Sequence, residues 1–292
     1  MQIGEIWNMS GMWVVLVLIY SILKGSRDGM KKAALRLNSS DEILFFYSLI
    51  GFILIIPFSP NAFSVPPLYI WYSFIKAAVV CTAWICAFVA LKNMTVSLYG
   101  IMDLSRMLFS TLFGIFLLGE CMTAGKVVGI VLVSVGLVMS NLKKDSKGDR
   151  VTPLVLGAAL ANCLLNSVSA VMDKTLTVTM PPDALQFWFM FFLLVCYGGV
   201  LVVKREGVHI GTLRKNFWIP ILSISLIVGD RLLFIANSDP ESMITVMTVI
   251  KQSSVIVTIL TGWLFFKEKH IGYKMLCAAI ILCGICASVF FS

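Results

Sequence analysis

The segment LLGECMTAGKVVGIVLVSVGL, residues 117–137, has a counterpart in FFKEKHIGYKMLCAAIILCGI, residues 265–285. The two segments align without gaps at an offset of 148 residues, and three pairs are identical: Glu120 and Glu268, Lys126 and Lys274, and Gly136 and Gly284. Each segment is a short polar loop with Glu and Lys, followed by an unbroken apolar run that holds a late Gly. The offset is about half of the 292-residue chain, so this layout predicts an internal repeat.

The composition is that of a membrane protein. Hydrophobic residues make up 59% of the chain, charged residues make up 13%, and the mean hydropathy is +0.94. Soluble domains average about 25% charged residues. Because backbone polar groups in lipid must be satisfied within their own segment, and because the alternating pattern of a barrel is absent, we expect an all-α membrane protein. The eight cysteines lie mostly in apolar runs, where they are expected to act as small buried hydrophobic residues.

Ten apolar segments are long enough, or nearly so, to cross a bilayer. They are residues 12–33, 43–58, 69–91, 96–118, 124–141, 152–175, 184–203, 217–236, 242–266 and 272–291. The nine prolines fall between these segments or near their ends, where a missing N–H costs least. The charged stretch KKDSKGDR, residues 143–150, divides the ten segments into two sets of five.

Five crossings in each half predict an inverted repeat, because two copies with an odd number of crossings must lie upside down relative to one another. We therefore expect ten transmembrane helices arranged as two inverted five-helix repeats, residues 12–141 and 152–291, joined by a linker at 142–151. Inverted repeats are typical of transporters that work by alternating access with a site near the membrane midplane.

Basic residues in the loops predict the orientation of the chain. The loops after the odd-numbered segments hold fifteen Lys and Arg residues, whereas the other loops hold only Lys126 and Lys174. Because cytoplasmic loops are enriched in Lys and Arg, we expect the basic loops in the cytoplasm and both termini outside it. We expect an integral protein of a bacterial inner (plasma) membrane.

Several charged residues fall inside the apolar segments, where insertion of a charge costs about 2.5–3.5 kcal/mol. They are Lys24, Arg27, Asp28, Lys76, Asp103, Arg106, Arg231 and Lys251, with Asp173 and Asp230 nearer to segment ends. Such residues are expected to face the interior of the bundle, to pair, or to line a substrate path. Snorkelling is the competing interpretation for Lys24 and Arg27, and the favoured one for Lys76.

Spacing suggests how these charges pair. Lys24, Arg27 and Asp28 share one face of the first helix, and Asp103 lies three residues before Arg106 on the fourth. The latter two are alternatively an inert pair within one helix. The repeat offset aligns Asp103 with Lys251, and we expect this pair to approach one another near the pseudo-two-fold axis.

The basic residues outnumber the acidic ones, which predicts an electropositive pocket for an anionic or zwitterionic small molecule. The residues predicted to bind it are Lys24, Arg27, Asp28, Asp103, Arg106, Asn166, Gln186, Arg231 and Lys251. A carboxyl group in dry surroundings keeps a proton more readily than one in water, so acidic residues are candidate proton carriers. These carriers are Asp28, Asp103, Asp173 and Asp230.

The chain resembles the EamA family of the drug/metabolite transporter superfamily. The resemblance is carried by residues 102–140 and 242–285, and by SILKGSRDGMKKAAL (21–35), which is mirrored by CLLNSVSAVMDKTL (163–176). It implies a secondary transporter of small metabolites or drugs that works by proton coupling, exchange or facilitated passage. Helices four and nine of the family often contain Pro, whereas the segments 96–118 and 242–266 contain charged residues instead. The predicted outward termini also depart from the arrangement expected of the family.

Other function classes are less well supported. A multidrug exporter of organic cations, the alternative with the same fold, requires an unpaired carboxylate. A membrane enzyme acting on lipid phosphates would need clustered metal ligands, but the two histidines lie in loops of different halves and no catalytic motif appears. No GxxxxGK[ST] loop, other cofactor motif or metal motif is present, and the placement of the basic residues argues against nucleic acid. The expected partners are membrane lipid and a small-molecule substrate, and the protein is either a monomer or a homodimer.

Overall fold

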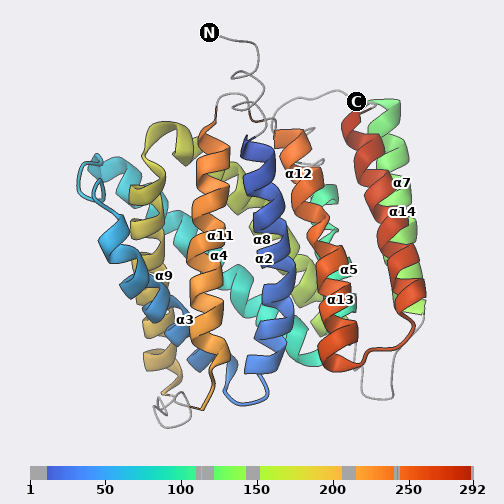
Figure 1. Cartoon of the computed structure of the whole chain (residues 1–292), viewed down its shortest axis with the longest axis horizontal. Helices are drawn as coiled ribbons and strands as arrows, with labels where there is room; N and C mark the ends of the chain where they lie inside the picture. The colour runs from blue at the N-terminus through green and yellow to red at the C-terminus, as the bar shows by residue number, and fades with distance from the viewer. Residues whose placement is uncertain are drawn as a thin grey trace.

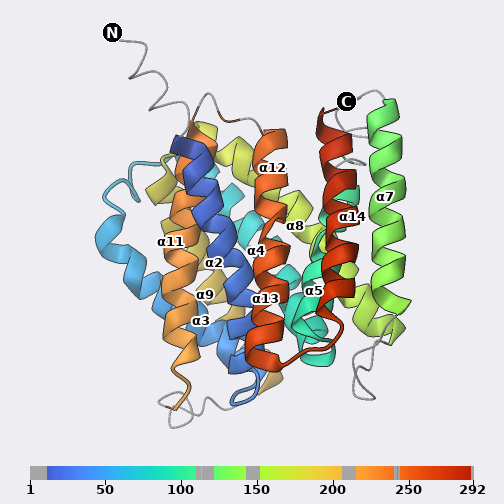
Figure 2. The same cartoon turned by 45° about the vertical axis from the view of Figure 1, so that its right-hand side comes forward.

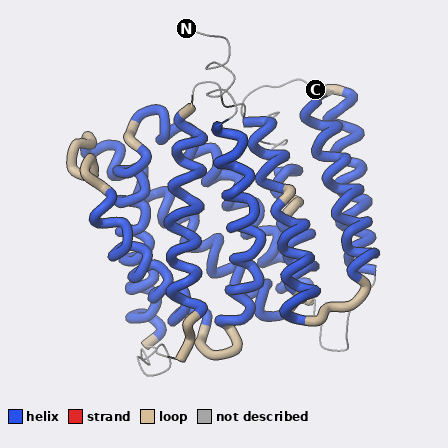
Figure 3. The backbone as a smooth tube through the Cα atoms, viewed as in Figure 1, coloured by secondary structure: helices blue, strands red, loops and turns tan. Residues whose placement is uncertain are grey.

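The computed structural model describes residues 12–109, 113, 122–142, 152–205, 215–239, 242 and 244–290. Within these ranges the chain forms helices joined by loops, with no strand, as Figures 1 and 3 show. The helices are α2 (Met12–Ala34), α3 (Ser40–Ile55), η1 (Ile56–Phe58), α4 (Pro67–Asn93), α5 (Val96–Asp103), α7 (Ala124–Leu142), α8 (Pro153–Thr179), α9 (Pro182–Lys204), α11 (Trp218–Ser238), α12 (Ile244–Gln252), α13 (Ser254–Phe266) and α14 (Ile271–Phe290). The predicted all-helical class is confirmed. Glu120 and nearly all of the predicted linker lie outside the described residues.

Seven helices in the described residues are long and apolar enough to cross a membrane, which makes the chain an integral membrane protein. They are 40–58, 67–93, 153–179, 182–204, 218–238, 249–266 and 271–288. The other three of the ten predicted segments, 12–33, 96–118 and 124–141, are not among these seven helices. Helix α2 is long enough but carries five charged residues between Lys24 and Lys32, and α7 contributes a shorter apolar helix. The fourth segment is only partly described.

Local sequence explains where several helices begin. Pro67, Pro153 and Pro182 each lie in the first turn, where proline removes no helical hydrogen bond. The side chain of Thr152 accepts a hydrogen bond from the Val155 amide and caps α8. These positions confirm that proline marks the helix ends.

The helices pack as an up-and-down bundle in which partners come from distant parts of the chain (Figures 1 and 2). Helix α2 packs along α11, α4 along α8, α3 along α9, and α7 along α14. Helix α2 begins and α14 ends at the same end of the bundle (Figure 1). These pairings bring the middle of α2, α4, α8 and α11 together around the charged residues described below.

Two of the predicted segments are interrupted. Helix α5 ends at Asp103, and Leu104 and Ser105 form a turn before helical structure resumes at Arg106. Helix α12 is separated from α13 by Ser253. The continuous helices expected at 96–118 and 242–266 therefore have breaks, although neither segment contains proline.

Neighbouring helices stabilise both breaks by binding the carbonyls there. Cys163 Sγ of α8 donates to Met102 O at 3.4 Å, and Ser21 Oγ of α2 donates to Ile250 O at 2.8 Å. The carbonyls of a break inside a membrane need such partners, because no bulk water is present to satisfy them. The donors therefore allow helices without proline to change direction beside the charged residues.

Candidate functional site

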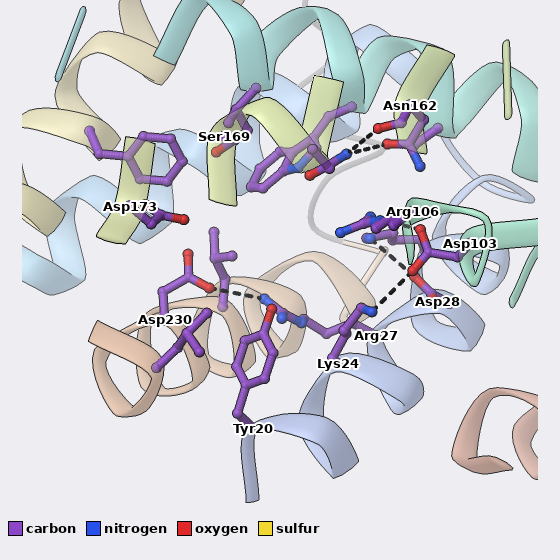
Figure 4. A pocket seen from close by; sticks show the side chains of 18 of the residues that line it. Tyr20, Lys24, Arg27, Asp28, Asp103, Arg106, Asn162, Ser169, Asp173 and Asp230 are labelled. Atoms are coloured by element: carbon purple, nitrogen blue, oxygen red, sulfur yellow. Dashed lines mark hydrogen bonds and ion pairs between the residues drawn. The ribbon is translucent and has the colours of Figure 1, made fainter. Parts of the chain in front are cut away.

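A polar cavity of about 110 Å³ lies in the middle of the bundle (Figure 4). Its charged lining residues come from α2, α4, α5, α8, α11 and the helical segment that resumes at Arg106. They are Lys24, Arg27, Asp28, Lys31, Lys76, Asp103, Arg106, Asp173 and Asp230. Uncharged polar side chains complete the wall, namely Tyr20, Tyr47, Tyr99, Asn162, Asn166 and Ser169. Five basic and four acidic side chains thus share one small space.

Asp103 is the centre of one charged cluster. Its carboxylate lies 3.0 Å from Lys24 Nζ and 2.7 Å from Arg106 Nη2 (Figure 4). The predicted pairing of Asp103 with Arg106 is therefore present, and it crosses the break after α5 rather than lying inside a continuous helix. The expected pairing with Lys251 is not: the carboxylate pairs with Lys24 of α2 instead.

Two further ion pairs join helices from different halves of the chain. Arg27 Nη1 of α2 lies 3.7 Å from Asp230 Oδ1 of α11, and Lys76 Nζ of α4 lies 3.0 Å from Asp173 Oδ1 of α8. Asp28 is bound within its own helix by Lys31 at 3.2 Å. All four acidic residues of the cavity therefore have a basic partner.

The interpretation of Lys76 as a snorkelling residue is wrong. Its side chain is 2% exposed, and Nζ lies 3.4 Å from the centre of the Phe189 ring in addition to its ion pair with Asp173. Helix α4 begins at Pro67, so Lys76 lies in the third turn of the helix. The nearby carboxylate and aromatic ring compensate the buried charge.

A second cavity of about 120 Å³ adjoins the first, sharing Lys24, Arg106, Asn166 and Asp173 among its lining residues, and adds Lys251 and Gln252 from α12. Within the described ranges Lys251 has no carboxylate at ion-pair distance. Lys24 and Arg106 share the single carboxylate of Asp103, and Asp173 pairs with Lys76, so Lys251 leaves this cavity with excess positive charge.

Gln252 adds hydrogen-bonding capacity to the second cavity. Its side chain is 5% exposed, and Oε1 has no hydrogen-bond partner. A buried amide oxygen without a partner costs free energy, so the residue is suited to a ligand that donates a hydrogen bond. Sequence reasoning missed Gln252, because the adjacent charge of Lys251 was the stronger signal.

Gln186 and Arg231, predicted to bind substrate, line neither cavity. Arg231 Nε donates to Gln186 Oε1 at 2.7 Å, and Arg231 Nη2 donates to Phe58 O at 3.0 Å. Gln186 Nε2 in turn donates to Ile227 O at 2.8 Å. The two side chains thus connect α9, α11 and η1. The polar groups satisfy each other, which is why they persist in an apolar region.

Other lining residues were missed for different reasons. Asn162 and Asn166 lie four residues apart on α8, and Asn166 Nδ2 donates to Asn162 Oδ1 at 2.6 Å. That spacing was a usable signal, but only Asn166 was selected. Tyr20, Tyr47 and Tyr99 gave no signal, because tyrosine is also common at membrane interfaces. Within the described part of the chain, no three His, Cys, Asp or Glu side chains are grouped as metal ligands would be.

Comparison with known proteins supports the fold and a family. A solved crystal structure aligns with 97% of this chain and 96% of its own length, with a TM-score of 0.61 and 14% sequence identity, which shows a shared fold. A search of the curated proteins found no match. The model of the EamA-like transporter family matches residues 11–142, so this part of the chain is similar to that family.

Proposed function

We propose that the chain is a secondary transporter that moves a small anionic or zwitterionic metabolite through the two central cavities. The observation that carries this proposal is the excess of positive charge around Lys251, Arg106 and Lys24, next to the unpartnered amide oxygen of Gln252. A carboxylate or phosphate would bind the basic groups, and a neighbouring hydroxyl or ammonium would donate to Gln252. EamA-like proteins are transporters rather than enzymes, which agrees with the proposed transport function.

The proposal includes ten membrane-spanning helices in two inverted five-helix repeats. A pair of equivalent hydrogen bonds supports it. Met102 and Ile250 are 148 residues apart, the offset of the repeated segments, and each accepts a bond at a helix break. Their donors, Cys163 and Ser21, are 142 residues apart. Lys32 and Lys174 have the same spacing, and they coincide when residues 21–35 are aligned with residues 163–176.

Helix packing supports the same repeat. If α2 is equivalent to α8 and α4 to α11, then the pairing of α2 with α11 corresponds to the pairing of α4 with α8. Each of these helix pairs has one ion pair at the cavity. Helix α2 supplies the cation Arg27, whereas its equivalent α8 supplies the anion Asp173, so the two charges are exchanged between the repeats. The pairings of α3 with α9 and of α7 with α14 then lie across the pseudo-two-fold axis.

Alternating access gives the inter-half ion pairs a role. Movement of one half against the other changes the separations of Arg27 from Asp230 and of Lys76 from Asp173. A carboxylate that loses its cation in this way becomes a suitable proton acceptor, so Asp230 and Asp173 are the proposed proton carriers. Asp28 and Asp103 are paired within one half and are weaker candidates.

Ligand-induced thermal stabilisation tests the proposal. Purified wild type, Lys251→Gln and Gln252→Leu would be screened against carboxylates, phosphate esters, amino acids and lipophilic cations, with exposed Lys269→Gln as the control. We expect an anionic or zwitterionic compound to raise the Tm of wild type and of the control. Loss of one charge-assisted contact should weaken its binding to Lys251→Gln by about tenfold or more.

The competing function is export of organic cations. The tyrosines of the first cavity suit a cation, whereas each of its four carboxylates already has a basic partner. Stabilisation of wild type and Lys251→Gln by the same lipophilic cation, with no response to anions, would support that alternative. Uptake of the identified compound into proteoliposomes, in the absence of ATP, would then establish transport.

A further inference from the structure

A groove of about 280 Å³, separate from the two cavities, lies between α2, α13 and the start of α11. Its lining residues are Ser26, Gly29, Met30, Ala33, Arg36, Leu37, Trp218, Thr261, Phe265 and Phe266. Figure 2 shows the lower ends of α2 and α13 side by side at this place. None of the ten residues lines either central cavity, so the groove is a distinct candidate site.

The dimensions of the groove fit one lipid chain. From Ser26 to Ala34, where α2 ends, the helix rises by roughly 12 Å, which is most of one leaflet of the ~30 Å hydrocarbon core. Above the groove the two helices are in contact, because Thr258 Oγ1 donates to Gly25 O at 3.3 Å. The groove therefore ends where α2 and α13 meet at Gly25, next to Lys24 of the central cavity.

The outer end of the groove is basic. Arg36 is exposed, its guanidinium carbon lies 4.8 Å from the centre of the Phe266 ring, and it has no carboxylate partner among the described residues. Exposed Lys215 and Lys267 lie in the loops next to Trp218 and Phe266. A tryptophan beside basic residues is typical of the boundary between hydrocarbon and headgroups.

We propose that this groove binds one anionic phospholipid. The acyl chain lies along Met30, Ala33 and Phe265, and the phosphate binds the N–H groups of Arg36. The mainly apolar lining favours an acyl chain over a small water-soluble anion, and a guanidinium without a carboxylate partner favours an anionic headgroup over a zwitterionic one. Because α2 and α13 belong to different halves of the chain, the lipid would stabilise their contact.

The test measures Tm in detergent against increasing phosphatidylglycerol, with phosphatidylcholine and water-soluble glycerol phosphate as parallel ligands. The variants are Arg36→Gln, which removes the headgroup contact, and Ala33→Phe, which fills the groove without changing charge. Arg205→Gln removes an exposed arginine at the end of α9 and is the matched control.

We expect phosphatidylglycerol to raise the Tm of wild type and of Arg205→Gln more than phosphatidylcholine does. Half-saturation of Arg36→Gln should need about fivefold more lipid, the factor for one basic residue near an anionic surface. Ala33→Phe should show no rise in Tm with phosphatidylglycerol. This variant tests the groove independently if Arg36→Gln folds poorly. Equal stabilisation by phosphatidylcholine, a full response to glycerol phosphate alone, or an unchanged response of Ala33→Phe would each overturn the proposal.

Discussion

At the scale of single residues, the buried pair of Lys76 and Asp173 gives a direct test of the charged interior. Lys76→Met leaves the Asp173 carboxylate without its ion-pair partner, and we expect it to lower the free energy of unfolding by about 3–5 kcal/mol. The double variant Lys76→Met/Asp173→Leu removes both charges and should recover a large part of that loss. Equilibrium unfolding of wild type, both single variants and the double variant measures the coupling. Additive losses would contradict a direct pair.

Sequence alone predicted much of this cluster, because charges in apolar segments are costly and helical spacing shows which ones share a face. Lys24, Arg27 and Asp28 line the same cavity, as that spacing indicated. The exact partners were not predictable, because they depend on which helices pack together. Asp103 pairs with Lys24 instead of Lys251, and Arg231 pairs with Gln186 away from the cavities.

At the scale of helices, the Glu of the repeated loop caps a helix of the other half. Glu268 accepts hydrogen bonds from the backbone amides of Val96 at 2.7 Å and Ser97 at 3.2 Å, at the start of α5. Lys274 lies 3.0 Å from the same carboxylate. The carboxylate also interacts favourably with the positive end of the helix dipole.

Loss of this cap should destabilise the fold. We expect Glu268→Ala to lower the free energy of unfolding by about 2 kcal/mol, because it removes two capping bonds and an ion pair. Glu268→Gln keeps an acceptor and should lose less, and exposed Lys269→Ala in the same loop should change little. Thermal unfolding in detergent ranks the three. A Glu268→Ala protein as stable as Lys269→Ala would show that the cap is unimportant.

The repeated sequence identified this Glu but gave no indication of its role, because capping across halves requires the two halves to be placed in space. The helix breaks beside Asp103 and Gln252 were missed for a related reason. Their stabilising donors, Cys163 and Ser21, are far away in sequence, and no proline marks either break. Apolar length predicts a crossing, whereas a break within it depends on neighbours.

At the scale of the whole molecule, composition and the repeat were enough to predict an all-helical membrane protein. The number of crossings is a harder inference, because a charged helix such as α2 is too polar to qualify on its own. Its charges are tolerated because Asp103 of α5 pairs with Lys24, Asp230 of α11 pairs with Arg27, and the carbonyl of Leu91 in α4 accepts from Lys32. A helix can therefore belong to the membrane domain through its packing rather than through its hydropathy.

The orientation of the bundle is a prediction that follows from its two ends. The last turns of α2, α9 and α13 lie at one end of the bundle, whereas α2 begins and α14 ends at the other (Figure 1). The first end holds basic residues such as Arg36, Arg205 and Lys267. Since basic loops stay in the cytoplasm, both termini should face away from it.

Reporter fusions after residue 292 test this orientation in a bacterial host. Alkaline phosphatase, which is active only outside the cytoplasm, should be active there, and green fluorescent protein exported in unfolded form should not fluoresce. Fusions after residue 146, in the predicted linker, should give the opposite result and serve as the internal control. A fluorescent C-terminal fusion with an inactive phosphatase fusion would reverse the orientation and place Arg36 in the outer leaflet. The charge bias would then have to be explained by contacts within the protein rather than by insertion.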